Sequence, residues 1–152
     1  MNRRALFLVL AALAITAPAL PAYADQPAVH TGLLSNAGVG GYDPVAYFTT
    51  GAPTRGSSQF KTTHQGVEYR FANAENLARF RANPSAYLPQ YGGYCAWAVS
   101  QGYTAPGDPR RWRIVNGRLY LNYNADVQRR WDAERGPLIA RGDANWPSVL
   151  RR

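Results

Sequence analysis

The stretch WRIVNGRLYLNY, residues 112–123, decides the fold class of this chain. Two short apolar and aromatic runs, Trp112–Val115 and Arg118–Tyr123, flank the dipeptide Asn116-Gly117. Asn-Gly tolerates the positive φ angles of a two-residue turn, so the pattern predicts a β-hairpin.

A second hairpin is predicted upstream of the first. Gln59–Thr63 and Val67–Phe71 are rich in β-branched and aromatic residues, and His64-Gln65-Gly66 separates them. Gly66 suits the turn, which places His64 at the tip of the hairpin or just before it.

Short helices are predicted before and between the hairpins. Asp43-Pro44 is a helix-start signal, because Asp caps free backbone N–H groups and Pro is tolerated at the first helical position; the helix then covers Val45–Phe48. Gly92-Gly93 precede small and aromatic residues, and a short helix is expected to open at these glycines.

Each hairpin leads into a predicted helix with an asparagine cap. The first helix follows Asn73 and ends before Pro84. The second follows Asn124 and runs through Arg135, and Gly136-Pro137 separates it from a last helical piece. The expected fold is a small single α+β domain, two β-hairpins packed with several short helices, and no internal repeat is evident.

The N-terminal residues 1–24 have the pattern of an export signal. Arg3-Arg4 supply positive charge, Ala5–Ala17 form an apolar run too short to span a membrane, and Ala22-Tyr23-Ala24 is a small-x-small cleavage site. We therefore expect a periplasmic or secreted protein, cleaved near Ala24, with no stable membrane insertion afterwards. General and twin-arginine export both remain open. Residues 25–41 are expected to form an extended lead-in to a domain over 42–150.

Composition narrows the class of protein further. The 152 residues are 46% apolar and 17% charged, which excludes wholesale disorder and favours one folded domain. Cys95 is the only cysteine, so an intramolecular disulfide is excluded. A lone thiol in an oxidising compartment is expected to be buried, bound to metal or used in chemistry.

A metal site would need a mixed set of ligands, because the chain has neither a Cys-x-x-Cys nor a His-x-x-x-His pair. Cys95, His64 and an acid, Asp43 or Asp108, offer thiolate, imidazole and carboxylate ligands. Such a set suits copper or zinc better than calcium. The alternative is that Cys95 is a buried apolar residue and His64 faces solvent in its turn.

Two other kinds of site are considered. Cys95 after Gly92-Gly93 would act as a nucleophile with His64 as its base, although the sequence favours binding over enzymatic activity. Arg110, Arg111 and Arg113 around Trp112 would form an aromatic and basic surface for an anionic small molecule, glycan or protein. Export argues against nucleic acid, and the alternative for the arginines is a solvated basic edge.

Several motifs, in this order, resemble the exported YHS-domain family over about residues 41–147. They are Tyr42–Phe48, Tyr69–Phe71 leading into Asn76 and Phe80, Pro84 with Tyr87, Tyr91–Ala96, and Asn116–Tyr123. The resemblance implies a β-hairpin plus helix over residues 71–87 and a role in binding or handling a soft metal, with Cys95 as the ligand carried over. The chain differs from the smaller modules of this kind in having no Tyr-His-Ser triplet and one cysteine.

The sequence thus predicts an exported metal-binding or metal-handling protein that uses Cys95, with His64 and Asp43 as further ligands and copper or zinc as the metal. The alternative is a non-catalytic binding module that presents Arg110, Arg111, Trp112 and Arg113 to an anionic ligand or protein partner.

Overall fold

The computed structural model describes residues 25–151. The predicted signal segment, residues 1–24, lies outside the described residues, as does Arg152. No helix within residues 25–151 is long and apolar enough to cross a membrane.

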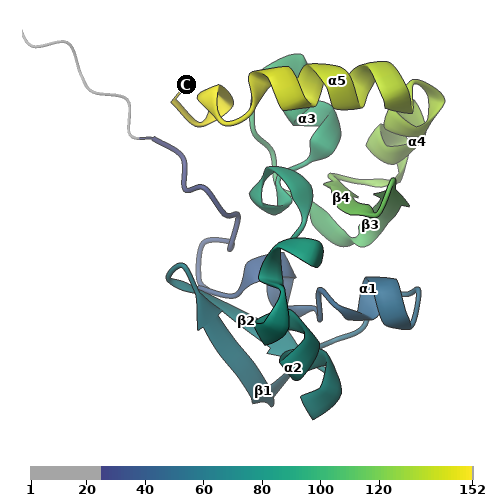
Figure 1. The fold of residues 1–152 in the computed structure, drawn as a ribbon. Helices are drawn as coiled ribbons and strands as arrows, with labels where there is room; N and C mark the ends of the chain where they lie inside the picture. The colour runs from purple at the N-terminus through teal and green to yellow at the C-terminus, as the bar shows by residue number, and fades with distance from the viewer. Residues whose placement is uncertain (1–24, 152) are drawn as a thin grey trace, which may run out of the picture.

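The predicted α+β class is confirmed (Figure 1). The α-helices are α1 (Ala46–Thr49), α2 (Ala74–Ala82), α3 (Ala96–Gln101), α4 (Ala125–Ala133) and α5 (Arg135–Asn145). The strands are β1 (Ser57–His64), β2 (Val67–Phe71), β3 (Asp108–Val115) and β4 (Arg118–Asn122), and short 3-10 turns are η1 (Gly38–Gly41), η2 (Pro84–Ala86), η3 (Gln90–Gly93) and η4 (Ser148–Arg151). The strands form two separate antiparallel pairs, β1 with β2 and β3 with β4.

Both predicted hairpins are present, each with a two-residue turn at positive φ. Gln65 and Gly66 have φ of 49° and 80°, and Asn116 and Gly117 have φ of 50° and 73°. His64 is the last residue of β1 and pairs with Val67, so it precedes the turn.

The asparagine caps are also confirmed. Asn73 Oδ1 accepts from the Asn76 N–H at 2.8 Å, and Asn124 Oδ1 accepts from the Val127 N–H at 2.9 Å. The helix after Asn124 ends sooner than expected, because the break falls at Glu134. Gly136-Pro137 lie inside the first turn of α5, where a missing proline N–H costs no helical hydrogen bond.

The helix expected at Gly92-Gly93 begins later, at Ala96. Tyr91, Gly92 and Gly93 have φ of 57°, 61° and 81°, and three successive residues in this left-handed region cannot lie in a right-handed α-helix. They form the tight turn η3, and the chain then runs through Tyr94 and Cys95 before α3 starts.

The two halves of the chain repeat one fold, which corrects the expectation of no internal repeat. We call η1 to α2, residues 38–82, the first unit, and η3 to α4, residues 90–133, the second unit (lower and upper parts of Figure 1). Each unit has a turn, a short helix, an eight-residue strand, a five-residue strand and a nine-residue helix. The first strand of each hairpin also has a register irregularity near its start.

The backbone angles of the opening turns support this correspondence. Val39, Gly40 and Gly41 have φ of 54°, 59° and 80°, within a few degrees of the values in η3. The residue two positions after each turn makes an equivalent backbone hydrogen bond. The Asp43 N–H donates to Thr54 O, and the Cys95 N–H donates to Ala105 O, each at 2.8 Å. η1 therefore belongs to the folded unit and not to an extended lead-in, and Val39 is buried in the core.

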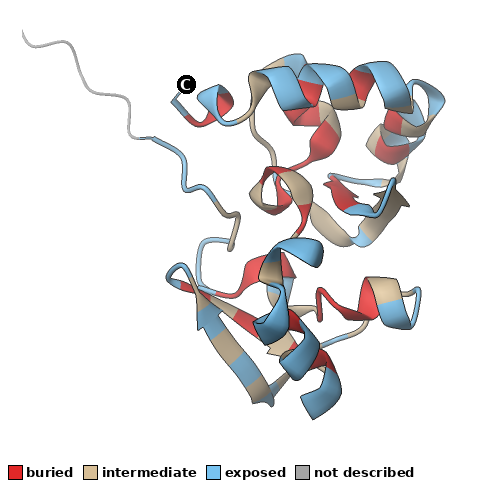
Figure 2. Cartoon of the chain, viewed as in Figure 1, coloured by how far each residue is buried: buried red, intermediate tan, exposed pale blue. Residues whose placement is uncertain are grey.

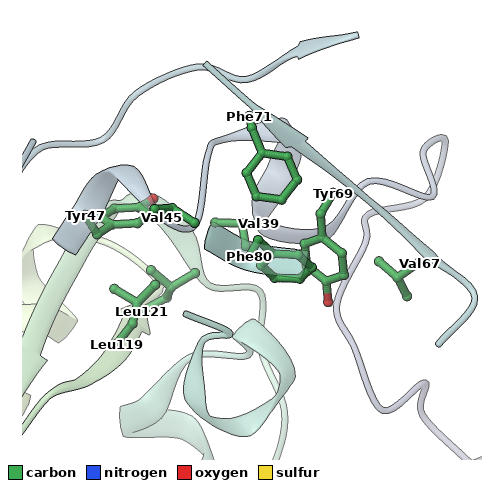
Figure 3. Close-up of a cluster of buried hydrophobic side chains, with 9 residues drawn as sticks. All are labelled: Val39, Val45, Tyr47, Val67, Tyr69, Phe71, Phe80, Leu119 and Leu121. Carbon is green, nitrogen blue, oxygen red and sulfur yellow. The ribbon is translucent and has the colours of Figure 1, made fainter. Parts of the chain in front are cut away.

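The buried side chains form two clusters, one for each unit. The first cluster comprises Val39, Val45, Tyr47, Val67, Tyr69, Phe71, Phe80, Leu119 and Leu121 (Figure 3). The second comprises Tyr91, Tyr94, Ala96, Val99, Tyr120, Trp131, Leu138, Val149 and Leu150. Leu119 and Leu121 come from β4, so the second unit completes the core of the first.

Two further segments cover the second unit. α5 packs there through Leu138 and Gly142 and is otherwise mainly exposed or half-buried (Figure 2). The lead-in runs along the same unit: Gln26 N–H donates to Leu150 O at 2.7 Å, and His30 N–H donates to Gly92 O at 2.9 Å. The lead-in is thus tied to both the η3 turn and the end of the described chain.

Candidate functional site

Cys95 lies between η3 and α3, beside the end of β4. It is 1% exposed, and its Sγ donates to Asn122 Oδ1 at 3.6 Å. The same oxygen accepts from the Trp97 N–H at 3.1 Å. Asn122 is itself fully buried, and its Nδ2 has no hydrogen-bond partner within residues 25–151. The thiol and this amide therefore form a small polar group inside the second unit.

A cavity of about 150 Å³ adjoins the thiol. It is lined by Cys95, Trp97, Ala98, Tyr103, Ala105, Tyr123 and Val127. An apolar cavity of about this size holds a benzene-sized molecule in other proteins. Although Cys95 is buried, it thus lines a space that a small ligand can occupy.

Two opposing effects act on the ionisation of the thiol. Burial raises the pKa of Cys95, and this is the largest effect. Hydrogen bonding from the backbone N–H groups of Ala98, Tyr123 and Trp97 lowers it, because these donors favour a thiolate. The resting group is a neutral thiol, but it is surrounded by donors suited to a negative charge.

The first unit has a carboxylate at the equivalent place. Asp43 is fully buried, and its Oδ1 accepts from the N–H groups of Val45 at 2.8 Å and Ala46 at 3.2 Å. Its Oδ2 accepts from the Ala72 N–H and from Asn76 Nδ2, both at 2.8 Å. The predicted capping role of Asp43 is confirmed, and both of its oxygens are occupied by donors from this chain.

The two environments correspond residue by residue. The pairs are Asp43 with Cys95, Val45 with Trp97, Ala46 with Ala98, Ala72 with Tyr123, and Asn76 with Val127. We call the donors around each of these side chains the first nest and the second nest. The three backbone donors are common to both nests, whereas the side-chain amide of Asn76 is replaced by the apolar Val127.

The predicted metal ligands are not brought together. His64 is half-buried on β1, with its ring edge against Phe80 at 5.9 Å between ring centroids. Asp43 is enclosed in the first nest, and Asp108 forms an ion pair with Arg110 at 3.0 Å. In the described part of the chain, no three His, Cys, Asp or Glu residues are grouped so as to hold a metal ion.

The predicted catalytic pair is not assembled either, since the residues that line the Cys95 cavity include no histidine. His30 packs instead against Tyr94, 5.4 Å between ring centroids, and burial lowers its pKa. It lines a different cavity of about 420 Å³, formed by the lead-in and the segment 104–106.

The arginine surface has partners within the chain. Arg113 pairs with Asp132 at 2.8 Å, as Arg110 does with Asp108. Trp112 is half-buried, and its ring packs on Tyr47 at 5.3 Å between centroids. The charges of Arg110 and Arg113 are thus paired within the chain, and Trp112 takes part in the contact between the two units. Arg111 is half-buried on the same strand.

Sequence reasoning missed Asn122, Tyr103 and the cavity. The signal that could have found them is the similarity of Val39-Gly40-Gly41-Tyr42 to Tyr91-Gly92-Gly93-Tyr94, which aligns Asp43 with Cys95. Comparison with family models, curated proteins and solved structures finds no match.

Proposed function

We propose that this protein is an exported YHS-type domain that binds a soft metal ion, copper or zinc, through the Cys95 sulfur. The observation that carries the proposal is the second nest: three backbone N–H groups surround a sulfur that adjoins a cavity. The first nest supports it, since the equivalent backbone N–H groups there donate to the side-chain oxygens of Asp43.

The chemistry of the donors fits a soft metal. Thiolate is the ligand that copper(I) and zinc prefer, and it must lose its proton to bind. Because burial raises the pKa of Cys95, metal binding releases a proton at neutral pH, and the affinity rises with pH. The backbone donors of the second nest offset the charge of the thiolate.

Cys95 would be the single protein ligand in this proposal. His64 and Asp43 have other partners in the first unit, so the remaining ligands are small exogenous groups held in the cavity. A space of about 150 Å³ has room for such groups, since a water molecule occupies roughly 30 Å³ of liquid. Exchangeable ligands favour a protein that passes metal on over one that stores it.

The test is metal content after export. Wild type, Cys95→Ser and His64→Ala are purified from the periplasm without chelator and measured by elemental mass spectrometry. We expect close to one copper or zinc per chain in wild type and in His64→Ala, and none in Cys95→Ser. Equal metal content in wild type and Cys95→Ser would refute the proposal. Loss of metal in His64→Ala would instead support the three-ligand set expected from the sequence.

The alternative function is an anion-binding module, and the half-buried Arg111 beside Arg110 on β3 is the observation that favours it. Its expected signature is salt-sensitive binding to an anionic matrix that weakens in Arg110→Ala and Arg111→Ala but not in Cys95→Ser. Binding that ignores salt and both substitutions would exclude it.

A further inference from the structure

The first nest shows what the second nest is built to hold. In the first, a –CO₂⁻ group one bond from Cβ receives donors from Val45, Ala46, Ala72 and Asn76. The second nest keeps the three backbone donors but surrounds a sulfur with no oxygens. A cysteine sulfinate, –SO₂⁻, has the same connectivity and charge as an aspartate carboxylate, with sulfur in place of Cγ.

We propose that Cys95 is a site of oxidation to a sulfinate, which the second nest holds as the first nest holds the Asp43 carboxylate. The proposal goes beyond metal binding and requires no metal. It adds a modification to a site that the proposed function treats only as a ligand.

Asn122 is the independent sign that an acceptor is missing. Its amide is fully buried beside Sγ, with Oδ1 on the thiol and Nδ2 without a partner within residues 25–151. A buried donor that is left without an acceptor destabilises the folded chain. Once the thiol proton is lost to oxidation, rotation of this amide presents Nδ2 to a sulfinate oxygen. The Trp97 N–H, which donates to Oδ1 of Asn122 in the reduced chain, then donates to the sulfinate, as the equivalent Val45 N–H donates to Asp43. Asn122 then supplies the amide donor that Asn76 supplies in the first unit.

The cavity provides room for the reaction. Hydrogen peroxide is little larger than water, and the thiol faces a space of about 150 Å³. In the first step the sulfur attacks one peroxide oxygen: an S–O bond forms, the O–O bond breaks, and Cys–SH plus H₂O₂ gives Cys–SOH plus H₂O. A second peroxide adds the second oxygen in the same way, giving Cys–SO₂⁻, a proton and another water. Sulfur gives up two electrons in each step, and each peroxide accepts two.

The reaction is directed past the sulfenic acid because no second thiol of the sequence intercepts it. Cys95 is the only cysteine, so no second thiol can form an intramolecular disulfide, and burial excludes bulky external thiols. The raised pKa of the thiol slows the first step, because the thiolate is the reactive form. The second nest therefore stabilises the sulfinate product and does not speed its formation. A sulfinate also removes the soft ligand, which makes oxidation and metal binding mutually exclusive.

The first experiment uses the metal-free mature chain and graded hydrogen peroxide, followed by intact mass and peptide mapping. We expect a plateau at a gain of about 32 Da, two oxygens, located on Cys95 and absent from Cys95→Ser. The oxidised chain should unfold at a higher temperature than the reduced chain. An unreactive native thiol, continued oxidation to the sulfonate without a plateau, or a lower unfolding temperature would each overturn the proposal.

A second experiment needs no oxidation. Cys95→Asp and Cys95→Asn have side chains of the same shape and differ in charge, so their comparison isolates the preference of the second nest. We expect the Asp variant to melt several degrees above the Asn variant at neutral pH. An Asp variant that melts below the Asn variant would show that the nest does not accept an anion. Because both readouts exclude metal, they stand apart from the test of metal binding.

Discussion

The two units share a backbone but use its most buried donors differently. In the first unit Asp43 accepts from every donor of its nest. These hydrogen bonds join the residue after a turn to the start of a helix and to the end of a hairpin. In the second unit Cys95 stands at the same place beside a cavity, and Nδ2 of the neighbouring Asn122 has no hydrogen-bond partner within residues 25–151. The difference teaches that one arrangement of N–H groups is fully occupied when a carboxylate fills it and adjoins an unfilled cavity when a thiol does.

The units also differ in how their cores are closed. The first core is completed by Leu119 and Leu121 of β4, whereas the second is completed by Leu138 of α5 and by Val149 and Leu150 of η4. Tyr47 adds a polar link, because its hydroxyl donates to Pro109 O at 2.6 Å. We therefore expect both units to unfold together.

The largest difference in stability between equivalent substitutions in the two units is expected at Asp43 and Cys95. Asp43→Ala leaves three buried donors and one half-buried donor without an acceptor and should lower the free energy of unfolding by about 4 kcal/mol. Cys95→Ala removes one sulfur beside an existing cavity and should cost about 1 kcal/mol. Urea unfolding of both variants against wild type measures the difference. Equal losses would mean that the two nests carry similar structural weight.

The helix caps should be equivalent where the nests are not. Asn73→Ala and Asn124→Ala each remove one side-chain acceptor at a helix start and should each cost about 1 kcal/mol. Asn→Ser at either position retains an acceptor and is the matched control. Thermal unfolding of the single and double variants tests whether the costs are equal and additive. A clearly larger loss of stability at one cap would show that the two caps are not equivalent and that one unit depends more on its helix.

The smallest effect is a loss of stability at alkaline pH, caused by the buried tyrosines Tyr69 and Tyr120, which occupy equivalent places in the two units. It is absent at neutral pH. Burial raises the pKa of Tyr69 to about 12 and also raises the pKa of Tyr120. An unfolded tyrosine ionises near pH 10, so the stabilisation is present below pH 10 and is lost as the pH rises toward 12. Denaturant titrations should show this fall, and Tyr69→Phe should flatten it. A fall of the same steepness in Tyr69→Phe would assign the loss to other groups.

Local chemistry made the hairpins and caps predictable. Asn116-Gly117 and Gly66 specify their turns, and Asn73 and Asn124 specify their helix starts, because each signal acts within a few residues. The helix expected at Gly92-Gly93 was wrong for the same local reason: paired glycines also permit a left-handed turn, and α3 starts only at Ala96.

The candidate site was less predictable because it depends on contacts between distant segments. The sequence singled out Cys95, but the N–H group of Tyr123 and the amide of Asn122 reach it only through the fold. His64 looked like a plausible partner by residue type, yet its ring packs against Phe80. The duplication itself was hidden because Asp43 and Cys95, the pair that reveals its meaning, have unlike side chains.

The hydrogen bond from Gln26 to Leu150 has a consequence for engineering the chain. It holds residues near both ends of the described segment against each other, so a short flexible linker can join them without crossing the protein. New ends can then be opened at the exposed Gln65-Gly66 turn, which carries no buried side chain. A circular permutant of this kind would keep every residue of both nests, but β2 and α2 of the first unit would be synthesised first and η1, α1 and β1 last.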